Sequence, residues 1–83
     1  MSTREILAIN LKYYRYKLNL SQEKFAEKLG STLPCINQLE NVRRKPSLEL
    51  IDKFADKLGV SAAKLLTYNP KHIINKQRID SKK

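Results

Sequence analysis

The residue types that most often carry out covalent or acid-base chemistry are scarce in this chain. It contains one cysteine, Cys35, and one histidine, His72, and the two lie far apart in the sequence. Neither belongs to a spacing of carboxylates or metal ligands that suggests a reactive site. The sequence therefore predicts that the chain is not an enzyme and has no metal site or cofactor. A redox-sensing role for Cys35 stays open, but it would need an exposed, readily ionised thiol.

The charge of the chain points to a partner with many negative charges. Lys and Arg number 17 against 8 Asp and Glu, which gives a formal net charge of +9 on 83 residues. Nucleic acid is the natural partner for such an excess, and an anionic membrane surface is the alternative. The alternative would use the basic end of the chain, where five cations surround three isoleucines, but that apolar face is too thin for strong insertion. The cations are Lys71, Lys76, Arg78, Lys82 and Lys83.

Membrane spanning is not expected, because no apolar run approaches the length that a bilayer requires. The first residues, MSTREILAINLKYY, lack the continuous apolar segment of a signal peptide. A single cysteine also fits a reducing compartment. We therefore expect a cytoplasmic protein, without a small-molecule ligand.

The elements that must position any binding residues are helical. Apolar residues recur at helical spacing, and Gly and Pro divide the chain into helix-sized pieces without a run that alternates apolar and polar residues. Ser21 is expected to cap the second helix alone, because Lys24 occupies the position where a Glu or Gln would complete a capping box. The class is all-α, with helices at about 4–18, 21–30, 32–41 and 47–59 and a short fifth helix from Ser61.

Composition divides the chain into two parts. Residues 1–69 form one domain, and residues 70–83 form a basic tail, broken by Pro70, that is either a weak helix or unstructured. A single modest core is all that a chain of this length can build, so association of subunits is expected to add stability.

The run LSQEKFAEKLGSTLPCINQLENVRRKPSLELIDKFADKLGVSAAKLL resembles the phage-repressor-like helix-turn-helix family, also called the Cro/CI or xenobiotic-response-element type. The resemblance covers about residues 7 to 67 and rests on many positions together, among them Gln22, Ala26, Gly30 and Ile36. It implies a compact five-helix lambda-repressor-like domain that binds double-stranded DNA. Two helices joined by a short turn also need a small residue where they touch and a flexible one at the turn, which Ala26 and Gly30 supply.

The resemblance also implies roles for particular residues. The amino terminus of the second helix and the turn after the third would contact phosphates, and the third helix would enter the major groove. Gln38 could pair bidentately with adenine. The implied base-reading residues are Thr32, Leu33, Cys35, Asn37 and Gln38; the implied phosphate contacts are Ser21, Gln22, Asn41, Arg43, Arg44 and Lys45; and Arg15 and Glu40 would form a structural ion pair.

Two features depart from the family pattern. Leu33, Pro34 and Cys35 offer few hydrogen bonds to bases, and a proline disfavours helical geometry in the residue before it, which favours a third helix that begins at Pro34. We hypothesise that Leu33 contacts a thymine methyl group. Val42 stands where relatives commonly have glycine, and because a β-branched residue resists positive φ, the turn after the third helix is expected to differ in shape.

The predicted function is a transcriptional regulator, expected to be a repressor, that binds an operator through residues 33–41 as a homodimer. Relatives usually pair through surfaces near the fifth helix, and the candidates for that contact are Leu66, Tyr68, Ile73 and Ile74. The competing interpretation is a protein-binding adaptor or antitoxin-like module on the same scaffold, with weak or non-specific DNA binding. The apolar start of the third helix favours the adaptor, and the net charge favours the regulator.

Overall fold

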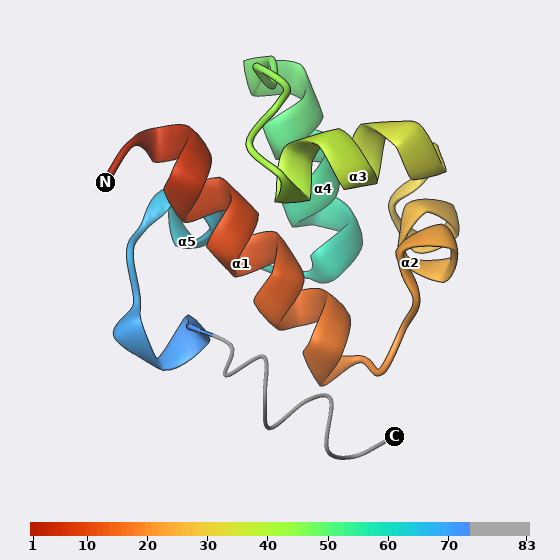
Figure 1. Cartoon of the computed structure of the whole chain (residues 1–83), viewed down its shortest axis with the longest axis horizontal. Coiled ribbons are helices and arrows are strands. Elements are labelled where there is room, and N and C mark those ends of the chain that lie inside the picture. The colour runs from red at the N-terminus through yellow and green to blue at the C-terminus, as the bar shows by residue number, and fades with distance from the viewer. Residues whose placement is uncertain (74–83) are drawn as a thin grey trace.

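Five α-helices and a short 3-10 helix make up the described part of the chain, residues 1–73 of a computed structural model (Figure 1). Within this range no residue lies in a strand, and the predicted all-α class with five helices is confirmed. The elements are α1 (Thr3–Lys17), α2 (Gln22–Leu29), α3 (Leu33–Glu40), α4 (Leu48–Leu58), α5 (Ala62–Leu66) and the 3-10 helix η1 (Pro70–His72).

A hydroxyl side chain begins each α-helix. Ser21 accepts a hydrogen bond from the backbone N–H of Lys24 at 3.1 Å without a reciprocal bond, as the sequence predicted. Ser2 and Glu5 form a complete capping box at the start of α1, in which each side chain accepts the backbone N–H of the other residue. Hydrogen bonding with Ser2 lowers the pKa of Glu5. Each cap satisfies a backbone donor that the first turn of a helix leaves free. The capping residues are Ser2, Ser21, Thr32, Ser47 and Ser61.

The start of α3 differs from the expectation that Leu33 lies outside the helix. Leu33 is its first helical residue, and Pro34 follows in the first turn. Thr32 takes the extended conformation of the cap, and its hydroxyl accepts the N–H of Cys35 at 3.3 Å. Because this bond caps the helix at Thr32, α3 begins one residue earlier than the expected start at Pro34. The proline does not oppose this start, since it lacks only an N–H that the first turn of a helix would leave free in any case.

The turn after α3 also corrects an expectation, because Val42 adopts a φ of +58° despite its branched side chain. Its N–H donates to the carbonyl of Leu39 at 3.2 Å, and the N–H of Arg43 donates to the carbonyl of Gln38 at 2.7 Å. This pair of bonds is the helix ending that glycine usually makes. The turn thus has the shape that glycine usually gives to a helix end, and the two hydrogen bonds offset the strain at Val42.

The core lies between α1, α2, α3, α4 and α5. Phe25, Phe54 and Leu11 are the largest side chains in it, and each is at most 1% exposed. Ala26 is buried as the short turn between α2 and α3 requires. The remaining buried members of the cluster are Leu7, Leu29, Cys35, Ile36, Leu39, Ile51, Ala55 and Leu65.

The connection between α2 and α3 is held from behind by α4. Gly30 ends α2 with a φ of +66°, a conformation in which a side chain would be strained. The ammonium group of Lys53, on α4, donates to the carbonyl oxygen of Gly30 at 2.6 Å. Figure 1 shows α4 behind α3, with α2 beside them. A charged hydrogen bond and the core together fix the place of α2 relative to α4.

The chain continues to pack beyond the predicted domain boundary at residue 69. Asn10, fully buried on α1, shares its amide hydrogens among the carbonyl oxygens of Lys64, Leu65 and Thr67 at 2.7 to 3.2 Å. Its Oδ1 faces Nδ1 of His72 at 2.8 Å, and the His72 ring stacks on Tyr13 with 3.7 Å between centroids. Pro70–His72 therefore lies against α1, while residues 74–83 of the predicted tail lie outside the described residues.

Candidate nucleic-acid interface

Helix α3 has one buried side and one solvent-facing side. Ile36 and Leu39 are at most 3% exposed and pack into the core. Asn37 is exposed and Gln38 is half-buried, so their amides lie at the outer surface. Thr32 and Leu33, at the start of the helix, are exposed as well, with Leu33 at 44%. The structure thus places four of the five predicted base-reading residues where a groove could reach them.

Cys35 is the fifth, and its burial does not support the predicted base-reading role. The residue is only 7% exposed and belongs to the hydrophobic core cluster. It precedes Ile36 and lies one helical turn before Leu39, so it extends the inner stripe of α3. Its burial also removes the basis for a redox-sensing thiol, which requires exposure.

An ion pair joins α1 to the end of α3. Arg15 Nε donates to Glu40 Oε2 at 2.8 Å, and Arg15 Nη2 donates to Glu40 Oε1 at 2.9 Å. A third guanidinium nitrogen donates to the carbonyl of Leu20 at 3.2 Å. Burial opposes the charge of Arg15, but the hydrogen bonds and charge of Glu40 outweigh it and raise the pKa of Arg15. The carboxylate that would repel phosphates is therefore neutralised, as the resemblance implied.

The ion pair continues to the surface through two amides. Gln22, the first residue of α2, donates from Nε2 to Glu40 Oε1 at 3.0 Å. Asn37 then donates from Nδ2 to Gln22 Oε1 at 3.2 Å. Gln22 thereby links the amino end of α2 to the outer face of α3. Sequence reasoning assigned Gln22 to a phosphate and missed this link, because a contact between helices leaves no periodic signal in the sequence.

A second contact orients the other amide. Arg44, in the turn after α3, donates from Nη1 to Gln38 Oε1 at 2.9 Å. The predicted bidentate pairing of Gln38 with adenine requires the same oxygen to accept from the base. In this structure the guanidinium already occupies that side of the amide. No signal in the sequence distinguishes this role of Arg44 from a phosphate contact.

Free cations flank α3. Arg43, Arg44 and Lys45 are all exposed, and within residues 1–73 none of them forms an ion pair. Asn41 is exposed too, and its amide donates to the backbone carbonyl of Asn37 at 2.8 Å. At the other side, Ser21 and Gln22 lie at the amino terminus of α2, where backbone N–H groups and the helix dipole suit an anion. The phosphate candidates thus lie on both sides of the outer face of α3.

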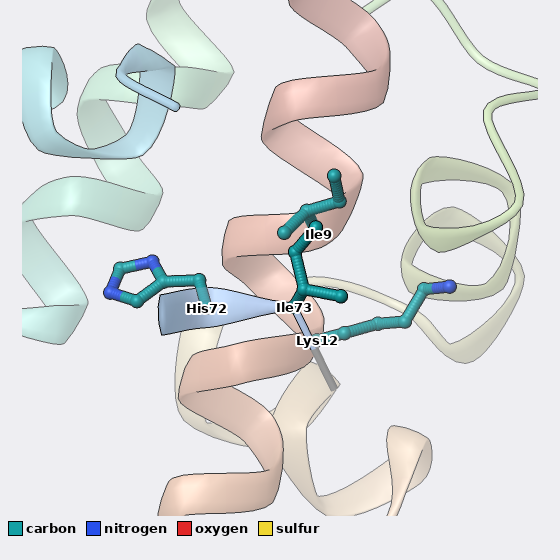
Figure 2. A pocket seen from close by; sticks show the side chains of 4 residues that line it. All are labelled: Ile9, Lys12, His72 and Ile73. Carbon is teal, nitrogen blue, oxygen red and sulfur yellow. The ribbon is translucent and has the colours of Figure 1, made fainter. Parts of the chain in front are cut away.

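The dimer-contact candidates lie near α5 and η1, apart from this surface. Leu66 is half-buried, and Tyr68 and Ile73 are 45% and 53% exposed. Figure 2 shows Ile73 beside Ile9 of α1, where the two residues line a small pocket together with Lys12 and His72. Ile74 lies outside the described residues. The described candidates offer an apolar but modest surface.

Residues 1–73 contain neither a metal-binding cluster nor a membrane-spanning helix. No group of three or more His, Cys, Asp or Glu residues there could hold a metal ion. None of the helices in that range combines the length and apolar character needed to cross a membrane.

Comparison with known proteins extends the resemblance. A family model described as helix-turn-helix matches residues 11–65. A control protein from Serratia marcescens, C.SmaI, is 40% identical over 67 residues, which cover 81% of this chain and 80% of that protein. A propionyl-CoA carboxylase regulator from Cereibacter sphaeroides is 40% identical over 68 residues, 82% of this chain, but the chain spans only 15% of its length.

Solved structures give the same result. A hypothetical transcription factor from Neisseria matches with a TM-score of 0.76 and 30% identity, over 96% of this chain and 85% of that one. The clp gene regulator ClgR from Corynebacterium glutamicum matches with a TM-score of 0.68 and 27% identity, over 80% and 86%. These relatives are named as regulators, which supports the prediction that the chain is not an enzyme. The chain belongs to the phage-repressor-like helix-turn-helix family of transcription regulators.

Proposed function

We propose that this protein binds a specific operator in double-stranded DNA through the outer face of α3 and thereby represses transcription. The observation that carries the proposal is the position of two outward amides, Asn37 and Gln38, between exposed cations and the amino terminus of α2. Amides read base edges, and cations and helix amino termini hold phosphates. Since chromosomal DNA would be the partner, the protein would act in the cytoplasm.

Phosphate contacts would supply most of the affinity and would not depend on sequence. Arg43, Arg44 and Lys45 are free to neutralise phosphates on one strand, and the first turn of α2 would meet the other. Binding should therefore weaken steeply as salt rises. Leu33, exposed at the head of α3, would contribute an apolar contact with a thymine methyl group.

A homodimer would place two copies of α3 in successive major grooves. Half-sites about 34 Å apart on one face of the duplex are the geometry that such a pair requires. Exposed apolar residues around α5 and η1, chiefly Tyr68 and Ile73, support pairing through that end of the molecule. A dimer would also reduce the exposed apolar surface of a small domain. Mass measurement in solution, with and without the selected duplex, tests this part, and a monomer under both conditions at high concentration would contradict it.

Selection of bound sequences from a random duplex pool tests the proposal as a whole. We expect an enriched motif with two symmetric halves, and we expect Asn37→Ala and Gln38→Ala to relax the preference within it. Lys57→Ala, which removes an exposed cation of α4 outside the surface described above, is the matched control and should leave the motif unchanged. A pool without enrichment would contradict sequence-specific binding.

The adaptor interpretation has one observation in its favour, the exposed Leu33 beside Pro34 at the head of α3. An apolar residue there could contact a protein groove as well as a thymine. A salt titration of binding to a random duplex separates the two functions, because an adaptor should bind little DNA at moderate salt and enrich no sequence.

A further inference from the structure

The two outward amides of α3 differ in the hydrogen-bonding group that they leave free. A side-chain amide has an oxygen that accepts and a nitrogen that donates, and a free rotation of the terminal bond could present either to a base. In this protein each amide has a partner that permits only one orientation. The partner of Gln38 is the charged Arg44, and the partner of Asn37 is Gln22, which is itself oriented by the charged Glu40.

The orientation of Asn37 follows from the buried ion pair. Glu40, paired with Arg15, is a carboxylate and can only accept, so Gln22 must turn Nε2 toward it. Gln22 then presents Oε1 to Asn37, and Asn37 must donate to it from Nδ2. Among residues 1–73, Asn37 Oδ1 has no side-chain hydrogen-bond partner. Asn37 therefore turns Nδ2 toward Gln22 and leaves the whole of Oδ1 free as an acceptor, together with one remaining hydrogen of Nδ2.

The orientation of Gln38 follows from Arg44 in the same way. A guanidinium has five donors and no acceptor, so the group of Gln38 that faces it at 2.9 Å must be Oε1. Within the described range no bond occupies Gln38 Nε2. Gln38 therefore leaves both hydrogens of Nε2 free as donors, whereas Oε1 keeps only one lone pair, next to the positive charge of Arg44. This is the opposite bias from that of Asn37.

We propose that Glu40, acting through Gln22, and Arg44 are positioning residues that fix an acceptor at Asn37 and a donor at Gln38, and so decide which base edges the protein accepts. The inference rests on the proposed function. The acceptor of Asn37 would favour the amino group of cytosine or adenine, and the donor of Gln38 would favour guanine, thymine or the N7 of adenine. Gln38 would disfavour cytosine, because the amino group of that base would have to approach the remaining lone pair of Oε1 beside the positive charge of Arg44.

The test is selection from a random duplex pool with the full chain and six variants, after thermal melting has shown that each is folded. Asn37→Ala and Gln38→Ala identify the position that each amide reads. Arg44→Ala should then admit cytosine at the Gln38 position, lowering the discrimination against it about fivefold, the worth of one hydrogen bond. Arg44→Lys, which can also only donate, should restore the exclusion of cytosine. Gln22→Leu should admit thymine and guanine at the Asn37 position by a similar factor.

Arg43→Ala is the matched control, because it removes the same charge from the same turn without touching either amide. It should weaken binding to every sequence and leave the base preferences unchanged. If Arg44 has only a structural or electrostatic role, Arg44→Ala should likewise weaken binding to every sequence and leave the base preferences unchanged. That outcome would overturn the inference while the proposed function stands. The inference would also be overturned if the natural chain preferred cytosine at the Gln38 position. It would fail as well if Gln38→Ala relaxed the base preference at no position. A natural chain that enriches no motif would overturn the proposed function and the inference with it.

Discussion

Helix α1 carries two buried polar side chains that differ in what they connect. Arg15 pairs with a carboxylate and leads through Glu40 and Gln22 to the outer face of α3. Asn10 is neutral, holds the end of α5 through three carbonyls and leads to His72. We call the contact of Arg15 with Glu40 the charged junction; it supports the candidate DNA surface. We call the contacts of Asn10 with the end of α5 and with His72 the neutral junction; it supports the end where a dimer contact is proposed. The difference teaches that one helix can support two separate regions of the fold by separate polar contacts.

Removing the carboxylate of the charged junction should have the largest effect. Glu40→Ala leaves Arg15, itself 9% exposed, as a buried charge without its partner, and we expect a loss of about 3 to 5 kcal/mol in the free energy of unfolding. Urea denaturation followed by circular dichroism measures it. Glu27→Ala breaks the exposed pair with Lys24 at 3.7 Å and serves as the control, with an expected change below about 0.5 kcal/mol. Equal losses in the two variants would contradict the importance of burial.

Removing the neutral junction should cost less. Asn10→Ala leaves carbonyl groups of Lys64, Leu65 and Thr67 without their donor, and two of these residues are exposed enough for water to replace it. We expect a loss of about 2 kcal/mol in the same denaturation experiment. Asn69→Ala, whose side chain caps η1 locally, is a milder control at that end. A loss larger than that of Glu40→Ala would reverse the ranking of the two junctions.

Relieving the turn that follows the charged junction should stabilise the protein. Val42 holds a φ of +58° that glycine adopts without strain, so Val42→Gly should raise the free energy of unfolding by about 1 kcal/mol. Asn19, at the same φ after α1, is the control, because asparagine tolerates this conformation and Asn19→Gly should change little. Destabilisation by Val42→Gly would show that its 37% exposed side chain packs more than it strains.

The smallest effect is a pH dependence confined to the neutral junction. Burial, Lys17 and Lys64 lower the pKa of His72 from its ordinary value of 6.5, and the Tyr13 and Tyr14 rings face the imidazole. The unfolded chain therefore binds the proton more readily, so the stability that neutral His72 contributes is present above pH 6.5 and is lost as pH falls below it.

Hydrogen exchange of the backbone N–H groups of η1, compared at pH values on both sides of 6.5 after correction for intrinsic rates, measures this dependence. The protection should fall in acid for the natural chain and stay level in His72→Phe, which keeps an aromatic ring without a titrating group. Protection that falls equally in both would show that another group is responsible.

Much of the fold follows from local signals in the sequence. Serine and threonine caps, glycine stops and apolar spacing give the helices to within about one residue, because each signal acts within a turn or two of chain. The two local errors, at Leu33 and Val42, arose where propensity was opposed by hydrogen bonds of the helix ends. A conformational preference of about 1 kcal/mol can be outweighed by such hydrogen bonds, because each of them contributes a similar amount.

The candidate site was less accessible to sequence reasoning. The outward position of Asn37 and Gln38 follows from helical spacing, but the spacing of Cys35 fits an outer edge as well as the inner stripe where it lies. The links from Gln22 to Asn37 and from Arg44 to Gln38 depend on the packing of α2 and on the turn after α3. The type of a residue shows whether its side chain can donate or accept a hydrogen bond, and the fold determines which partner it meets.

The bond from Lys53 to Gly30 has a consequence for how this protein would meet DNA. Because this bond and the shared core hold the turn between α2 and α3 against α4, we expect the orientation of these two helices to be set before DNA is met. Docking would then proceed as the approach of a rigid wedge, with little ordering entropy left to lose when the duplex is reached.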